Sequence, residues 1–218
     1  MIDLSQRNQT RIDIGIVDTG TANLESIRVA FRRIGVEARR IESGCEIATM
    51  TGVVLPGVGH FASGMEFLRR HGLVDPIRRR IEENRPTLAI CLGLQLLANG
   101  SDEAPGVSGI GAVDSSIRRL PPGPVRPHLG WNRIEVDRAR AACGVLESGA
   151  AYFANGFALN EVPIGWQAAW TSDGGRFVAA IEREGVVACQ FHPEISGSFG
   201  RDLLSRWVSL VGKEASCC

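Results

Sequence analysis

The sequence has no long apolar run and no excess of charge of either sign. Its 218 residues include 24 basic and 24 acidic side chains, and no apolar stretch approaches the length of a membrane span. Balanced charge gives no electrostatic reason to expect nucleic acid or an anionic membrane as a partner. The polar N-terminus lacks the apolar core of a secretory signal. We therefore expect a cytoplasmic protein that binds neither nucleic acid nor membrane.

Several short motifs that would indicate other chemistries are also missing. The cysteines show neither zinc-ligand spacing nor a disulfide rhythm; they are Cys45, Cys91, Cys143, Cys189, Cys217 and Cys218. No Gly-x-Gly-x-x-Gly occurs, and no Gly-rich turn ends in the Lys-Ser/Thr pair of a phosphate loop. We expect reduced thiols, of which one has a chemical role, and we expect no metal and no cofactor.

Strand-like and helix-like patterns alternate through the first half of the chain. This alternation indicates an α/β fold of three layers, in which a mainly parallel sheet is covered by helices on both faces. Residues 108–180 are richer in β-branched and aromatic residues and turn signals, which predicts added antiparallel strands. The expected strands are 12–18, 36–41, 52–55, 87–90 and 186–191, and the expected helices are 23–34, 61–70, 73–84, the run after Cys91, and 200–211.

Domain boundaries follow from the same patterns. We expect a polar extension over residues 1–11, one domain over 12–212 and a tail over 213–218. The arginine runs at 78–80 and 118–119 are predicted to be solvated surface and not phosphate clamps.

The junction at Cys91 is the most informative feature of the chain. An apolar strand candidate, 87–90, runs directly into a helix-like segment, and Gly93 permits close packing of that helix on the sheet. A cysteine at such a turn lies at a helix N-terminus, where free backbone N–H groups favour thiolate over thiol. The alternative is a buried core thiol, which is the commoner fate of an isolated cysteine.

A second junction lies about a hundred residues downstream. The strand candidate 186–191 ends at His192-Pro193-Glu194. Residues two apart in extended backbone project to the same side, so an imidazole and a carboxylate are presented together. With Cys91 they would form the nucleophile, base and orienting acid of acyl transfer. An isolated His-Pro-Glu would be a surface turn, but two such junctions in one chain favour catalysis.

A Gly-rich turn follows the third expected strand, at Leu55-Pro56-Gly57-Val58-Gly59. Backbone N–H groups exposed by such a turn can hold an anionic oxygen. The turn is a candidate oxyanion hole, and a purely structural turn is the alternative.

These segments together resemble the class I, triad-type glutamine amidotransferases. The likeness runs from about Asp13 to Val211 and is closest to the glutaminase subunits of imidazole glycerol phosphate synthase. It rests on four motifs in the family's order and spacing: Leu55-Pro56-Gly57-Val58-Gly59, Ile90-Cys91-Leu92-Gly93-Leu94-Gln95-Leu96-Leu97, Pro127-His128-Leu129-Gly130-Trp131-Asn132 and Gln190-Phe191-His192-Pro193-Glu194.

The resemblance implies a flavodoxin-like fold and a glutaminase that supplies ammonia for histidine biosynthesis. It implies a thioester on Cys91, with His192 and Glu194 completing the triad. It places the oxyanion hole at Leu92 and Val58. The implied glutamine pocket comprises Gly57, Gly59, Gln95, Gly156 and Phe157.

The same resemblance implies a partner. This is a (β/α)8-barrel cyclase that receives the ammonia and makes imidazole glycerol phosphate and an aminoimidazole carboxamide ribotide. The implied docking face includes Asn23, His128, Trp131 and Asn132. Trp131 suits an interface anchor, because indole buries a large area and keeps an N–H, although a core position is nearly as compatible with its type.

One segment departs from the family. Where the family has Phe-Val-His-Ser-Tyr, this chain has Phe153-Ala154-Asn155-Gly156-Phe157, and His60 stands where a small residue is usual. Loss of the hydroxyl would cost roughly 1 kcal/mol of glutamine binding. Three other functions therefore stay open: a paralogue whose barrel partner amidates a sugar, a non-catalytic scaffold subunit, and, with least support, a peptidase.

Overall fold

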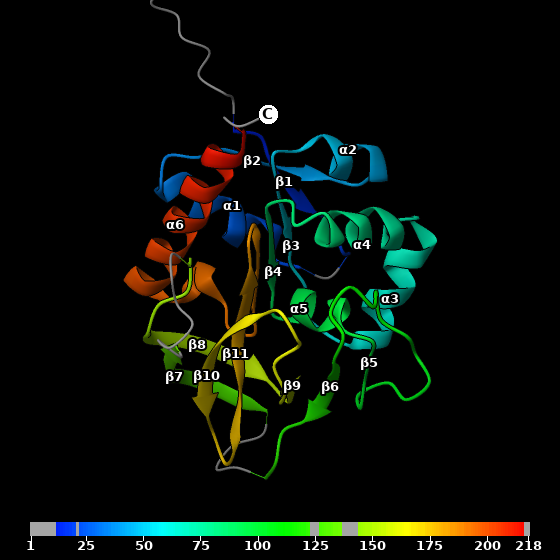
Figure 1. Ribbon diagram of the computed structural model, residues 1–218, viewed down its shortest axis with the longest axis vertical. Helices are drawn as coiled ribbons and strands as arrows, with labels where there is room; N and C mark the ends of the chain where they lie inside the picture. The colour runs from blue at the N-terminus through cyan, green and yellow to red at the C-terminus, as the bar shows by residue number, and fades with distance from the viewer. Residues whose placement is uncertain (1–11, 21, 123–126, 137–143, 216–218) are drawn as a thin grey trace, which may run out of the picture.

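The computed structural model describes residues 12–20, 22–122, 127–136 and 144–215. Within them the chain forms a nine-stranded mixed sheet in the order β2-β1-β3-β4-β12-β11-β10-β7-β8 (Figure 1). The parallel strands are β1 (Ile14–Val17), β2 (Ala38–Ile41), β3 (Gly52–Leu55), β4 (Thr87–Ile90) and β12 (Val186–Cys189). The antiparallel strands are β7 (His128–Val136), β8 (Gly149–Asn155), β10 (Gln167–Ser172) and β11 (Arg176–Arg183).

Helices cover both faces of the parallel strands (Figure 1). One face carries α1 (Leu24–Arg33) and α6 (Gly197–Ala215), which meet through the rings of Phe31 and Trp207. The other carries α2 (Gly44–Thr49), α3 (Phe61–Arg70), α4 (Val74–Glu82) and α5 (Leu92–Leu97). Two apolar cores result, one on each side of the sheet. The predicted three-layer α/β class is confirmed.

The added strands predicted for the middle of the chain are also present. Beside β7, β8, β10 and β11, a smaller sheet contains β5 (Gly100–Ser101), β6 (Ser116–Arg119) and β9 (Phe157–Leu159). A short 3-10 helix, η1 (Pro193–Ile195), leads from β12 into α6. In the described part of the chain, no helix is long and apolar enough to cross a membrane.

The structure differs from the expected elements at two places. Helix α2 was not expected, although its signal was in the sequence: the Ser43 side chain accepts from the Glu46 N–H, and Glu46 accepts from the Ser43 N–H in return. Helix α6 is longer than expected, and residues 213–215, assigned to the tail, belong to its last turn. The extension over residues 1–11, Cys143, and the Cys217–Cys218 pair lie outside the described residues.

The prediction that residues 78–80 are solvated is wrong for Arg80. Its side chain is 2% exposed and donates to the backbone carbonyls of Ile47, Met50, Thr51 and Pro86 at 2.8–3.3 Å. A guanidinium has five N–H donors, so one side chain can satisfy several carbonyls that face the interior. Arg80 therefore joins α4 to the end of α2 and to the starts of β3 and β4.

Replacing Arg80 with methionine is expected to lower the free energy of unfolding by about 3–5 kcal/mol, because buried carbonyls lose their donors. Urea unfolding of the purified chain measures the change. The neighbouring Arg79 is exposed, so Arg79→Met is the matched control and should stay within about 0.5 kcal/mol of wild type. Equal stability of the two variants would contradict this assignment.

Candidate active site

The two junctions of interest lie side by side at the carboxyl ends of neighbouring parallel strands. Strand β4 pairs with β12, with Ile90 opposite Cys189. Cys91 follows β4 directly, and residues 190–192 follow β12. The carboxyl edge of a parallel sheet is where ligands bind in open α/β folds.

Cys91 occupies a strained turn. Its φ is 54° and its ψ is −109°, a backbone conformation that residues other than glycine rarely adopt. The turn is held because the Cys91 N–H donates to the Cys189 carbonyl at 2.8 Å. A Cβ at Gly93 would lie 1.9 Å from the Leu55 carbonyl oxygen, so only glycine allows α5 to pack this closely on β3. The cysteine is thereby fixed at the start of α5.

His192 and Glu194 are in contact. Nδ1 of His192 lies 2.8 Å from Oε1 of Glu194, and both side chains are about one-tenth exposed. The His192 backbone is anchored to β8, because its N–H donates to the Tyr152 carbonyl at 2.9 Å. The carboxylate therefore fixes the orientation of the imidazole and leaves Nε2 for other partners.

The environment of His192 favours its charged form. Burial acts against the imidazolium and is the largest single effect, but the hydrogen bonds and charges of Cys91 and Glu194 together outweigh it and raise the pKa of His192 from 6.5 to about 10. At neutral pH the imidazole is thus protonated. By contrast, burial raises the pKa of the Cys189 thiol well above its ordinary value, and Cys189 is a core residue with no exposure.

A line of amide groups lies behind the cysteine. Gln95, on α5, donates through Nε2 to the Phe157 carbonyl at 3.0 Å and to Oε1 of Gln190 at 3.1 Å. Nε2 of Gln190 in turn lies 3.7 Å from the Cys91 sulfur. Both N–H bonds of the Gln95 amide are therefore used, and Oε1 is the atom that it can offer to a ligand. No sequence pattern pointed to a separate role for Gln190, because its partner lies 99 residues away in the chain.

The expected oxyanion hole is not open in this conformation. The Leu92 N–H donates to the Gly57 carbonyl at 3.2 Å, so that carbonyl occupies the donor that an oxyanion would need. Gly59 has a φ of 98°, and the Val58 side chain is 40% exposed. The turn 56–59 thus packs against the start of α5 with a carbonyl, and not an N–H, facing Leu92.

The departing segment lies beside this line of amides. Asn155 is buried, and its Nδ2 donates to the Phe157 carbonyl at 3.1 Å. The Gly156 carbonyl accepts from the Leu120 N–H at 3.0 Å, and the Arg119 guanidinium lies 4.6 Å from the centre of the Phe157 ring. The segment is therefore ordered and fixed to β6 without the family's hydroxyls.

The expected docking residues have different surroundings. The placement of His128 on a docking face is wrong, because it is 7% exposed and stacks on Phe153 with ring centres 5.2 Å apart. Trp131 is 58% exposed and is not a core residue. Asn23 caps α1 through the Ser26 N–H, and the Asn132 Nδ2 donates to the Ser172 carbonyl at 2.8 Å.

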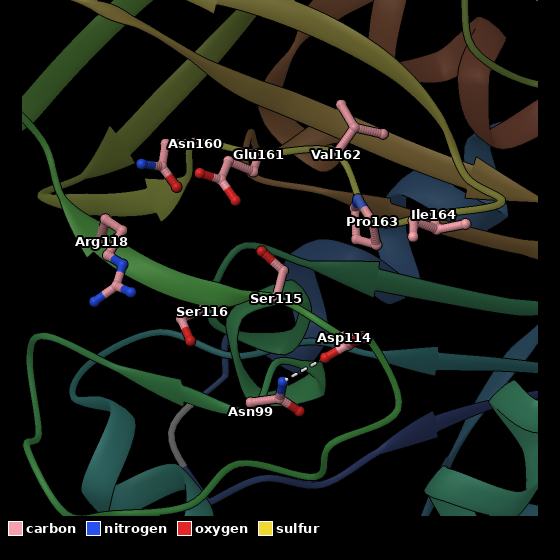
Figure 2. Close-up of a pocket in the computed structure, with 10 residues that line it drawn as sticks. All are labelled: Asn99, Asp114, Ser115, Ser116, Arg118, Asn160, Glu161, Val162, Pro163 and Ile164. Atoms are coloured by element: carbon pink, nitrogen blue, oxygen red, sulfur yellow. Dashed lines mark hydrogen bonds between the residues drawn. The ribbon is translucent and has the colours of Figure 1, made fainter.

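A separate polar cavity lies away from the cysteine. Its volume is about 370 Å³, and its lining includes Asn99, Asp114, Arg118 and Ile164 (Figure 2). Figure 2 shows the Asn99 amide directed at the Asp114 carboxylate, to which it donates at 2.9 Å. Because neither a cysteine nor a histidine lines it, this cavity is not a centre for nucleophilic catalysis of the kind described above.

Comparison with known proteins gives the class of this fold and site. The family model for class-I glutamine amidotransferases matches residues 15–209. The crystal structure of a glutamine amidotransferase superposes with a TM-score of 0.73 at 20% identity, covering 91% of this chain and 98% of that one. The crystal structure of a putative GMP synthase protein from Thermoplasma acidophilum gives a TM-score of 0.72 at 18% identity, covering 94% and 96%. The chain is a class I glutamine amidotransferase.

Curated relatives narrow this class. Imidazole glycerol phosphate synthase subunit HisH of Symbiobacterium thermophilum is 37% identical over 199 residues, which is 91% of this chain and 94% of that protein. The protein of the same name from Methanothermobacter thermautotrophicus is 37% identical over 201 residues, or 91% and 98%. Within the glutamine amidotransferases, the chain belongs to the HisH family, which confirms the resemblance read from its motifs.

Proposed function

We propose that the chain is the glutamine-hydrolysing subunit of an imidazole glycerol phosphate synthase and that Cys91, His192 and Glu194 are its triad. The observation that carries this proposal is the constellation at the ends of β4 and β12, in a chain of the HisH family: a cysteine on a strained turn, a protonated imidazole and a carboxylate 2.8 Å from it. Its product is ammonia, which a cyclase subunit consumes in histidine biosynthesis.

The proposed reaction has two halves. The Cys91 thiolate attacks the side-chain amide carbon of glutamine, and His192 gives its proton to the nitrogen as the C–N bond breaks and ammonia leaves. A water molecule then hydrolyses the thioester, with His192 as the base. Two of the effects that raise the pKa of His192 come from Cys91. Acylation removes the negative charge on sulfur, so the same imidazole loses that support and can act as a base.

The oxyanion hole forms in this scheme when the turn 56–59 changes conformation. Rotation of the Gly57–Val58 peptide removes the Gly57 carbonyl from the Leu92 N–H and turns the Val58 N–H toward the carbonyl oxygen of glutamine. Gly57 and Gly59 permit such a rotation, since both lack a side chain. Gln95, Gly156 and Phe157 complete the proposed pocket for glutamine.

The proposed partner is a (β/α)8-barrel cyclase that covers the side of the sheet where the triad lies. Leu129 and Trp131 lie two apart on β7 and are 53% and 58% exposed, and Ile195 on η1, next to Glu194, is 48% exposed. The Trp131 ring lies against Gly197 at the start of α6. Exposed apolar side chains beside the triad suit a partner that excludes water from the released ammonia. Asn23 and Asn132 complete the proposed docking face.

A binding and turnover experiment tests this function. The chain, mixed with a histidine-pathway cyclase and its phosphoribulosyl ligand, is expected to release glutamate faster than it does alone and to yield imidazole glycerol phosphate. Trp131→Ala is expected to weaken the complex by at least about 30-fold in Kd, measured by calorimetry, because it removes a central aromatic anchor.

The control for Trp131→Ala is Ile164→Ala. Ile164 is fully exposed and lines the cavity of Figure 2, away from the triad. Its loss should leave Kd unchanged. Equal affinities of both variants would exclude the proposed docking face. A stable complex that releases glutamate but makes no imidazole glycerol phosphate would favour a paralogue with another ammonia acceptor.

A further inference from the structure

Gln190 is a buried polar residue that the reaction scheme above does not use. Its side chain has no exposure, and it lies between Gln95 on α5 and the Cys91 sulfur. An amide in such a position can face the sulfur with its oxygen or with its N–H groups, and the two orientations have opposite effects on a thiolate. The surrounding hydrogen bonds decide between them.

The orientation follows from a backbone carbonyl. The Phe157 carbonyl can only accept, so the Gln95 side chain must turn its nitrogen toward it, at 3.0 Å. That nitrogen has a second N–H, which points to Gln190 at 3.1 Å and requires an acceptor there. Oε1 of Gln190 therefore faces Gln95, and Nε2 of Gln190 faces the Cys91 sulfur at 3.7 Å.

We propose that Gln190 is a positioning residue that stabilises and aims the Cys91 thiolate, with its own orientation set by Gln95 and the Phe157 carbonyl. This rests on the proposed role of Cys91 as nucleophile. His192 also supports the negative sulfur, but it must give up its proton during turnover. The Gln190 amide does not titrate in the working range, so its N–H remains available when the thiolate attacks and when it leaves again as the thioester is hydrolysed.

The relay also connects the departing segment to the sulfur. The Phe157 carbonyl that orients Gln95 accepts from the Asn155 side chain as well, at 3.1 Å. Changes at Asn155 therefore reach Cys91 through Phe157, Gln95 and Gln190, without contact between Asn155 and the thiol.

Alkylation of Cys91 by iodoacetamide tests the proposal without glutamine. Gln190→Met keeps the length of the side chain and removes the donor. Gln190→Glu keeps an oxygen for Gln95 and places a second oxygen against the sulfur. We expect Gln190→Met to slow Cys91 alkylation at pH 7 by about 10-fold and to move the pH profile of alkylation to higher pH, with a larger effect for Gln190→Glu. Peptide mass spectrometry separates Cys91 from the other cysteines.

Turnover with the cyclase partner provides the second readout. We expect kcat for glutamate release to fall about 10-fold in Gln190→Met with KM nearly unchanged, because Gln190 contacts the sulfur and not the substrate. Gln167→Met, the same exchange on β10 away from the thiol, is the control and should match wild type in both assays.

The outcomes separate this inference from the proposed function. Wild-type alkylation profiles in both Gln190 variants would overturn the role of Gln190 whether or not the chain hydrolyses glutamine. If Gln190→Met does not fold, Gln190→Glu, which is isosteric with the native residue, decides the question by the same profile. Failure of the glutaminase function itself would appear instead as activity that survives loss of Cys91.

Discussion

Replacement of Cys91 by alanine is expected to reduce glutamate release by at least about 10³-fold, because no other group at the ends of β4 and β12 can form the thioester. The measurement is glutamate production by the chain in complex with the cyclase. Cys45→Ala is the matched control, since Cys45 is an exposed free thiol at the start of α2. It should retain full activity.

The same variant distinguishes the remaining alternatives. The Cys91→Ala complex should still accept free ammonium, because the cyclase chemistry is carried by the other subunit. Glutamine-dependent product formation that persists in Cys91→Ala would identify the chain as a scaffold. Loss of glutamate release with preserved ammonium-dependent turnover would place the whole defect in the glutaminase step.

Glu194→Gln is expected to lower kcat for glutamine hydrolysis by roughly 10²–10⁴-fold, because an amide can present its N–H to Nδ1 and select the wrong tautomer. The change also removes two of the effects that hold the imidazole charged, the hydrogen bond and the charge of Glu194. The pKa of His192 should therefore fall from about 10 toward 6.5, and the protonated fraction at pH 8 should fall with it. Ring carbon NMR of His192 follows this titration.

The control for Glu194→Gln is Glu184→Gln. Glu184 is exposed in the turn between β11 and β12, so its neutralisation should change neither kcat nor the His192 titration. An unchanged titration in Glu194→Gln would show that the carboxylate 2.8 Å from Nδ1 has no part in holding the proton. The triad assignment would then lose its orienting acid.

Local pattern was sufficient where the controlling contacts are short in sequence. β3, β4 and α3 begin and end at the predicted residues, because apolar runs bounded by turns specify buried strands and the 3.6-residue period specifies an amphipathic helix. The contact of His192 with Glu194 follows the same logic, since the two residues are only two positions apart. The Cys91 turn was recognisable because the strand ends where the helix begins and Gly93 follows.

Tertiary structure decided what depends on distant segments. Arg80 lies on a helix with two other arginines, and only the carbonyls of α2, β3 and the loop before β4 draw it into the interior. His128 belongs to a docking motif, but the stacking of Phe153 places it in the core.

The sequence by itself determined the family, the three-layer fold and the residues proposed as nucleophile, base and orienting acid, because each is encoded within a few neighbouring positions. Only the tertiary structure decided that the Gly57 carbonyl closes the Leu92 N–H and that Gln190 faces the sulfur of Cys91. Both contacts join segments that are 35 and 99 residues apart in the chain. No local period or motif carries information across such separations; the packing of β3, β4 and β12 at one sheet edge supplies it.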